Sequence, residues 1–197
     1  MAEDQSYPRV KKFFFLFIFI LSFSKANSEN FKFIKIANLN NPWGSSFLNN
    51  DEMIITEKSG LIKIVNIINN QVNDVEHNLN FLEDGQGGLL DILHQENKVW
   101  ISYTENRGNR KTSTSIALAN LDKKNLVFKN IFQANPPINS GYHFGSRLAI
   151  KDNYLYASAG ERGKGMIAQD ASKHPGSIIR IHLDGSIPND NPKFDGK

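Results

Sequence analysis

The side chains best suited to chemistry in this sequence lie in two short motifs, with a strand-like segment between them. The first motif is Tyr142-His143-Phe144-Gly145-Ser146-Arg147, and the second is the turn Glu161-Arg162-Gly163. An imidazole held near a carboxylate can accept a proton at neutral pH, and the carboxylate can fix its tautomer. His143 and Glu161 are therefore a candidate base and its orienting acid. A histidine that begins a strand and only hydrogen-bonds a neighbouring loop is the commoner situation, because most histidines are not catalytic.

Other kinds of reactive site find no support in the sequence. The 197 residues include no cysteine, which excludes disulfides, zinc–thiolate sites, iron–sulfur clusters and cysteine nucleophiles. No Gly-x-Ser-x-Gly motif occurs, so there is no serine nucleophile elbow. The remaining histidines show no metal-ligand spacing and are expected to be solvated or structural; they are His77, His94, His174 and His182.

The charge distribution argues against a nucleic-acid partner. The formal net charge is +3, but residues 1–26 hold four basic and two acidic side chains, so the rest of the chain carries only +1. No cluster of lysine and arginine is dense enough to follow a phosphate backbone.

The beginning of the chain has the pattern of a secretory signal peptide. Lys11-Lys12 precede the unbroken apolar run Phe13 to Leu21, and the small residues Ser24 and Ala26 follow. The run is too short for a stable membrane span, which needs about 20 apolar residues. We expect cleavage after Ala26, a mature domain over residues 27–197, and a periplasmic or secreted location.

The first nine residues do not suit this leader. Glu3 and Asp4 place negative charge where a signal peptide carries positive charge. We hypothesise that Val10 is the true initiator, read from an alternative start codon in place of Met1. A peptide containing Ser6 to Arg9 in the unprocessed precursor would contradict this hypothesis.

Beyond the leader, runs of β-branched and aromatic residues alternate with Gly, Asn, Asp and Pro clusters, and no segment keeps a helical period. This composition predicts an all-β protein. Trp43 and Trp100 are expected in the cores of its sheets. The predicted strands are Phe31–Ile36, Met53–Thr56, Leu61–Ile67, Val99–Tyr103, Ser115–Leu118, Leu126–Phe132, Tyr154–Ser158 and Ile178–Ile181.

Three segments, 47–60, 92–108 and 149–163, are variants of one unit. In each unit a strand ends near Ser or Thr before a turn to glycine, so Thr56, Ser102 and Ser158 are equivalent positions spaced by 46 and 56 residues. Such a period, with about four strands per unit, is typical of β-propeller blades. Two full units and part of a third are too few to close a ring, which takes about four to eight blades. We therefore expect the N-terminal portion of a longer propeller.

An ordered set of motifs gives the mature chain a resemblance to a known family. The chain resembles the soluble, pyrroloquinoline quinone (PQQ)-dependent glucose/sorbosone dehydrogenases, most closely the bacterial aldose sugar dehydrogenases. The resemblance runs from about Phe31 to the last residue. It is carried by Pro42-Trp43-Gly44 with Phe47-Leu48, Gly85-Gln86-Gly87-Gly88-Leu89-Leu90-Asp91, His143-Phe144-Gly145-Ser146-Arg147-Leu148, Gly160-Glu161-Arg162-Gly163, Gln169-Asp170, Asp184-Gly185-Ser186-Ile187-Pro188 and Asp190-Asn191-Pro192.

The resemblance implies a six-bladed propeller that binds PQQ near its central axis and oxidises the anomeric hydroxyl of an aldose to a lactone. It implies that His143 is the general base, that Glu161 orients it, and that Gln86 contacts the sugar or the cofactor. Arg147 either contacts the substrate or cofactor or braces its blade. An imidazole suits proton abstraction at neutral pH, and an amide can donate to and accept from hydroxyls.

The resemblance also implies features that this sequence does not contain. The full-length enzymes carry further cationic cofactor contacts and calcium ligands in later blades, which would lie beyond Lys197. We therefore expect the chain alone to be inactive. An external electron acceptor, a quinone or a cytochrome, is the further implied partner. The alternative is a non-catalytic secreted propeller that binds carbohydrate or protein, which would have no need of His143, Glu161 and Gln86 together.

Overall fold

The computed structural model describes residues 31–193, so the predicted signal peptide over 1–26 and the proposed start at Val10 lie outside the described residues. Contacts divide the chain into Met1–Ile34 and Lys35–Lys197. Every strand of the described residues belongs to the second unit. Across residues 31–193, no helix combines the length and the hydropathy needed to cross a membrane.

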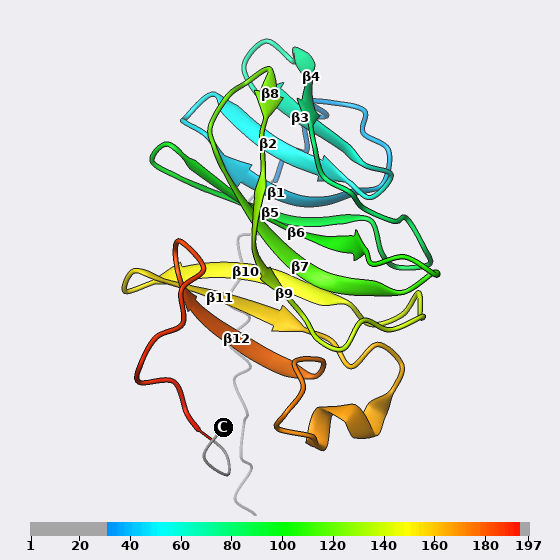
Figure 1. Cartoon of the computed structure of the whole chain (residues 1–197). Coiled ribbons are helices and arrows are strands. Elements are labelled where there is room, and N and C mark those ends of the chain that lie inside the picture. The colour runs from blue at the N-terminus through cyan, green and yellow to red at the C-terminus, as the bar shows by residue number, and fades with distance from the viewer. Residues whose placement is uncertain (1–30, 194–197) are drawn as a thin grey trace, which may run out of the picture. The chain divides into compact units, whose positions relative to one another are not determined.

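The second unit contains three sheets in chain order, and only the β4–β8 pair of the first sheet is parallel (Figure 1). The first sheet contains β1 (Pro42–Phe47), β2 (Glu52–Glu57), β3 (Leu61–Asn66) and β4 (Val72–His77), with the short β8 (Asn125–Leu126) parallel to β4. The second contains β5 (Leu89–Gln95), β6 (Lys98–Asn106), β7 (Thr112–Asn120) and β9 (Lys129–Gln133). The third contains β10 (Gly145–Lys151), β11 (Tyr154–Ala159) and β12 (Ser177–His182), and the 3-10 helix η1 (Gly165–Gln169) lies between its last two strands.

The order of the strands confirms the propeller prediction. The first strands of consecutive sheets lie side by side, because β5 contacts both β1 and β10. The described residues therefore hold two full blades, the first extended by the short β8, and three strands of another, as the repeat predicted.

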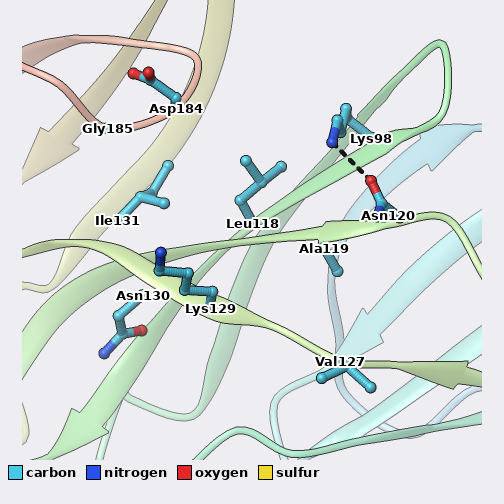
Figure 2. Close-up of a pocket in the computed structure, with 10 residues that line it drawn as sticks. All are labelled: Lys98, Leu118, Ala119, Asn120, Val127, Lys129, Asn130, Ile131, Asp184 and Gly185. Atoms are coloured by element: carbon cyan, nitrogen blue, oxygen red, sulfur yellow. Dashed lines mark hydrogen bonds between the residues drawn. The ribbon is translucent and has the colours of Figure 1, made fainter.

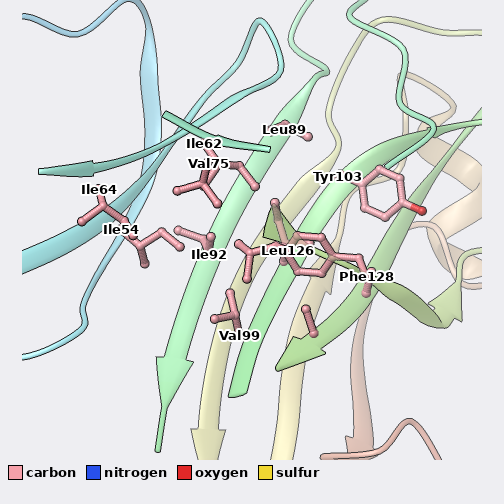
Figure 3. Packing of buried hydrophobic residues seen from close by; sticks show 13 residues of the cluster. Ile54, Ile62, Ile64, Val75, Leu89, Ile92, Val99, Tyr103, Leu126 and Phe128 are labelled. Atoms are coloured by element: carbon pink, nitrogen blue, oxygen red, sulfur yellow. The ribbon is translucent and has the colours of Figure 1, made fainter. Parts of the chain in front are cut away.

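Apolar side chains fill the two spaces between consecutive sheets. One cluster joins the first sheet to the second and includes Ile54, Ile62, Ile92 and Val99 (Figure 3). The other joins the second sheet to the third around Trp100, whose indole N–H donates to Leu183 O at 2.9 Å. Burying each isoleucine, leucine or valine of these clusters contributes about 1.5–3 kcal/mol, so packing between neighbouring sheets stabilises each of them.

The repeated hydroxyl position has a specific structural role in the first two blades. The inner strand β1 is irregular between Pro42 and Ser45, which removes the ladder partner of Gly44. Thr56 replaces that partner, because its Oγ1 accepts from Gly44 N at 3.0 Å. The same hydroxyl donates to Leu90 O on β5, and so links the first blade to the second.

The second blade repeats this arrangement, and the third repeats half of it. Ser102 Oγ accepts from Asp91 N at 3.0 Å within its own blade and donates to Ser146 O at 2.6 Å on the next inner strand. Ser158 Oγ accepts from Arg147 N at 3.1 Å. The equivalence inferred from the sequence is therefore a hydrogen-bonding pattern that satisfies each irregular inner strand and, in the first two blades, ties consecutive blades together.

Four details differ from the sequence predictions. Residues 31–36 form no strand. The predicted strand Leu126–Phe132 is divided into β8 and β9. The inner strands β1, β5 and β10 and the strand β4 were not among the predicted strands. Trp43 is 42% exposed on β1 and is not a core residue, whereas Trp100 is buried as expected.

Candidate active site

The β10–β11 hairpin sets the positions of the histidine and the glutamate. Gly145 at the start of β10 pairs with Ala159 at the end of β11. His143 and Glu161 each lie two residues beyond that pair, so the register places them at the same end of the hairpin. Gly160 allows the approach, since a Cβ atom there would lie 2.0 Å from His143 O.

His143 and Glu161 form a hydrogen-bonded pair. His143 Nδ1 bonds Glu161 Oε1, and Gly163 N donates to the same carboxylate oxygen at 3.1 Å. The bond from His143 holds the pKa of Glu161 below its usual value, and backbone donors act in the same direction. The carboxylate is therefore ionised at neutral pH, and the Nδ1–H tautomer is the one that it selects.

The other imidazole nitrogen faces outward. The His143 side chain is 54% exposed, and within residues 31–193 Nε2 has no hydrogen-bond partner. An imidazole with Nδ1–H on a carboxylate and a free Nε2 lone pair can accept a proton from a ligand.

Gln86 is the third member of this group. It lies in the loop before β5 in the second blade, and its Oε1 accepts from His143 N at 2.8 Å. Its own peptide N donates to Gly141 O at 2.8 Å, so the loop before β5 and the loop before β10 are joined twice. Gly85 is required there, because it has φ +56° and a Cβ atom would lie 2.5 Å from Gly141 O.

The backbone of His143 is itself held in an unfavourable conformation. Its φ is +50°, a region that costs a non-glycine residue about 1–3 kcal/mol and persists only where neighbouring contacts enforce it. Here the enforcing contacts are the Gln86 side chain on His143 N and the peptide N of Arg162, which donates to His143 O at 3.3 Å.

Arg147 is held apart from these three residues. One guanidinium nitrogen donates to Asp91 Oδ1 at 3.0 Å, while Asp91 Oδ2 accepts from Leu148 N at 2.8 Å. Asp91 is buried, but the Arg147 side chain is 71% exposed, and no hydrogen bond within the described range joins it to His143, Glu161 or Gln86. The Asp91 contact supports the bracing role between the second and third blades, and the exposed donors leave room for a ligand.

Sequence reasoning missed two residues that organise this region. Asp91 ends the Gly85–Asp91 motif, but nothing in the sequence shows that it accepts hydrogen bonds from Arg147 and Leu148 in the next blade. Arg162 stands beside Glu161, and its burial became evident only from the fold.

The remaining polar features lie elsewhere. His77 uses both ring nitrogens within its own blade, on Gly60 O at 2.8 Å and Leu79 N at 3.2 Å. Residues 31–193 contain no group of three or more metal-ligating side chains placed to hold an ion. A cavity of about 550 Å³ lined by Lys98, Leu118 and Asp184 lies at the Lys98–Asn120 end of β6 and β7 (Figure 2). The Arg162 contacts to Thr112 lie at the opposite end of those strands, so this cavity is separate from the histidine site.

Comparisons with known proteins agree with this architecture. The sequence model of the family described as Glucose / Sorbosone dehydrogenase matches residues 39–197. The aldose sugar dehydrogenase YliI of Escherichia coli is 31% identical over 164 residues, which cover 78% of this chain and 44% of that protein. Quinoprotein glucose dehydrogenase B of Acinetobacter calcoaceticus is 27% identical over 218 residues, covering 88% of this chain and 44% of that protein. The chain thus spans somewhat less than half the length of these relatives.

Solved structures show the same fold. The apo crystal structure of the soluble aldose sugar dehydrogenase from Escherichia coli superposes with a TM-score of 0.75 at 30% identity, over 80% of this chain and 49% of that one. The PQQ-bound aldose sugar dehydrogenase of Streptomyces coelicolor superposes with a TM-score of 0.69 at 24% identity, over 81% of this chain and 49% of that one.

Proposed function

Because the chain belongs to the glucose/sorbosone dehydrogenase family, we propose that it forms part of a PQQ-dependent oxidoreductase that converts aldose sugars to lactones at the anomeric hydroxyl. The relatives named as aldose sugar and quinoprotein glucose dehydrogenases support the substrate class and the cofactor. The observation that carries the proposal is the His143–Glu161 pair with its free Nε2, at the end of the hairpin where both motifs converge.

The donor set of the described residues fits an anionic quinone. Gln86 keeps its amide N–H₂ free for a ligand, because its hydrogen bond to His143 uses only the carbonyl oxygen. Arg147 uses one guanidinium N–H on Asp91 and exposes the others, and a guanidinium suits carboxylate oxygens. We propose that these two residues contribute to holding PQQ, which when bound would supply the two-electron acceptor for the C1 hydride. Calcium, which the family resemblance implies, would be bound outside the described residues.

His143 performs the proton transfer in this proposal. Nε2 accepts the proton of the C1 hydroxyl, and Nδ1–H donates to Glu161 throughout. As the imidazole becomes cationic, the ionised Glu161 stabilises it and keeps the ring in place. Gln86 Oε1 accepts from the peptide N–H of His143, so hydrogen bonds hold both the side chain and the backbone of that histidine.

Substitution of His143 tests this role in protein expressed from the complete reading frame. His143→Ala should lower kcat per PQQ-loaded site by about 10²–10⁴-fold, the usual effect of removing a general base, while PQQ binding stays mostly intact. His182→Ala is the matched control, because that histidine packs on Tyr154 in the same blade and its side chain makes no hydrogen bond to any residue from 31 to 193. An unchanged kcat for His143→Ala would remove the base assignment, whatever happened to the melting temperature.

We propose that the protein works in the periplasm or outside the cell and passes its electrons to an external quinone or cytochrome. The leader pattern over residues 1–26 supports the location. Mass spectrometry of protein recovered from the periplasm or medium should find a mature N-terminus at Asn27. Intact protein with residues 1–26 still attached would contradict processing.

A further inference from the structure

Arg162 is a buried cation that makes all of its contacts with neutral groups. The residue is 2% exposed. Its Nε donates to Tyr142 O at 3.0 Å, and its terminal nitrogens donate to Thr112 O at 3.2 Å, to Thr112 Oγ1 at 2.7 Å and to Ser140 O. The guanidinium also stacks on Phe144, with 3.5 Å between its central carbon and the ring centroid.

These contacts link three segments that are far apart in the chain. Thr112 begins β7 in the second blade, Ser140 to Phe144 form the loop that carries His143, and Arg162 itself directly follows Glu161. The peptide N of Arg162 also donates to His143 O. One residue therefore holds both members of the histidine–glutamate pair to a common point on the neighbouring blade.

The buried Arg162 guanidinium has no paired carboxylate within residues 31–193, so its desolvation costs free energy that an apolar side chain would not cost. No carboxylate oxygen of the described residues lies within 4.0 Å of its nitrogens, and burial lowers the pKa of Arg162 to about 10, partly opposed by the charge of Asp84. The side chain is still cationic at neutral pH. A buried charge is stable only where hydrogen bonds satisfy it, and an apolar side chain of similar volume would avoid the penalty.

We propose that Arg162 is the positioning residue of the site, holding the Ser140–Phe144 loop and the Glu161 turn at the distance at which His143 Nδ1 bonds the carboxylate. This inference rests on the function proposed for His143 and Glu161. It assigns Arg162 no contact with substrate or cofactor. The guanidinium is planar and has five N–H donors, so it can donate to three carbonyls and a hydroxyl while it stacks on an aromatic ring. The ammonium of lysine has three donors and cannot stack in this way, so lysine is a poor substitute.

Substitution with a neutral side chain of similar length tests the proposal. Arg162→Met in the complete protein should lower kcat by about 10–100-fold with KM within about twofold, because misplacing a catalytic group by about 1 Å can cost as much. Arg162→Lys should fall between Met and wild type. Arg180→Met is the matched control, since Arg180 also stacks on an aromatic ring in the third blade, with 4.0 Å to Tyr154, but bonds Asp190.

A spectroscopic measurement separates positioning from simple stabilisation. In protein with ¹⁵N-labelled histidine, the His143 ring, assigned by comparison with His143→Ala, should show the Nδ1–H tautomer in wild type and a mixture in Arg162→Met. A wild-type tautomer signal and wild-type kcat in Arg162→Met, with only the melting temperature lowered, would overturn the proposal.

A milder variant covers the case in which Arg162→Met does not fold. Thr112→Val removes the Thr112 hydroxyl, which accepts from Arg162 at 2.7 Å and donates to Ile138 O at 3.3 Å, while Arg162 keeps its bonds to Tyr142 O and Ser140 O in the His143 loop. It should lower kcat about 3–10-fold and broaden the tautomer distribution, on the same sensitivity of rate to position; wild-type values of both would overturn the proposal. If the wild-type protein loaded with PQQ oxidised no aldose, the proposed function would fail, and the tautomer signals would still decide the role of Arg162.

Discussion

Gln86→Ala distinguishes ligand contact from control of the histidine. Gln86 Oε1 accepts from His143 N at 2.8 Å, and the backbone bond from Gln86 N to Gly141 O survives truncation. The change therefore removes one hydrogen bond without releasing the loop. Such a bond contributes about 0.5–1.5 kcal/mol. Because His143 sits at φ +50°, we expect most of that loss to appear as misplacement of the ring.

This loss corresponds to a fall in kcat of about 2–12-fold. KM should rise as well if the free amide N–H₂ binds the sugar. Steady-state kinetics on protein saturated with PQQ gives both constants, and hydrogen exchange reports directly on the His143 amide, which should exchange faster in the variant. Gln71→Ala is the control, since Gln71 is an exposed glutamine that bonds Asn73 in the first blade. A rise in KM with unchanged kcat and unchanged amide exchange would refute the positioning argument and leave Gln86 as a ligand contact only.

Three further predictions concern the fold. Ser102→Ala removes the partner of two backbone groups, Asp91 N and Ser146 O, and should lower the free energy of unfolding by about 2–4 kcal/mol. Urea denaturation measures this loss, with the exposed Ser45→Ala as control. A loss below about 0.5 kcal/mol would contradict the role of the hydroxyl. Burial raises the pKa of Tyr103 to about 12. The protonated phenol therefore contributes its full stabilisation below pH 10, and this contribution is lost as pH rises towards 12. Tyr103→Phe should show a shallower fall in melting temperature at alkaline pH than wild type, and an identical fall would contradict this prediction. Residues 27–197 expressed alone should associate through the face that exposes Ile178. Ile178→Asp should therefore reduce the apparent mass in light scattering, whereas Ile68→Asp, at the same 71% exposure, should not. A monomeric wild-type fragment would refute this prediction.

The strands that could be predicted are those whose own residues favour the extended state. β2, β3, β11 and β12 consist largely of β-branched and apolar residues, and the structure places each within about a residue of the prediction. β1 (Pro42–Phe47) contains proline, glycine and two serines, which have low strand propensity. It becomes a strand because β2 pairs with it and β5 packs beside it. Propensity also failed in the other direction at Phe31–Ile36, whose apolar residues form no strand.

The part of the candidate site that could be predicted is the pair of motifs that flank the β10–β11 hairpin in the sequence. Two motifs joined by a hairpin must meet, and His143 and Glu161 do. The Gln86 contact crosses between blades, and only the resemblance indicated that this residue belonged with the pair. The burial of Arg162 depends on where Thr112 and Phe144 lie after folding, which no local pattern contains.

The site arises where the third blade departs from the second at one equivalent position. Glu105 follows the hydroxyl residue Ser102 by three positions, just as Glu161 follows Ser158. In the second blade, β6 continues through Glu105 to Asn106, and the carboxylate is buried against Ser115 Oγ at 2.7 Å. In the third blade, β11 ends at Ala159, and the turn at Gly160 directs the equivalent carboxylate to His143.

The two equivalent carboxylates therefore make different contacts: Glu105 is buried within its blade and Glu161 reaches His143, because β11 ends earlier than β6. Gly160→Ala tests this reasoning, because its Cβ atom would lie 2.0 Å from His143 O and the turn could not keep its present path. Loss of the His143 Nδ1–H signal together with a lower kcat is the expected result. Retention of both would show that the carboxylate reaches the imidazole without the tight approach that only glycine allows.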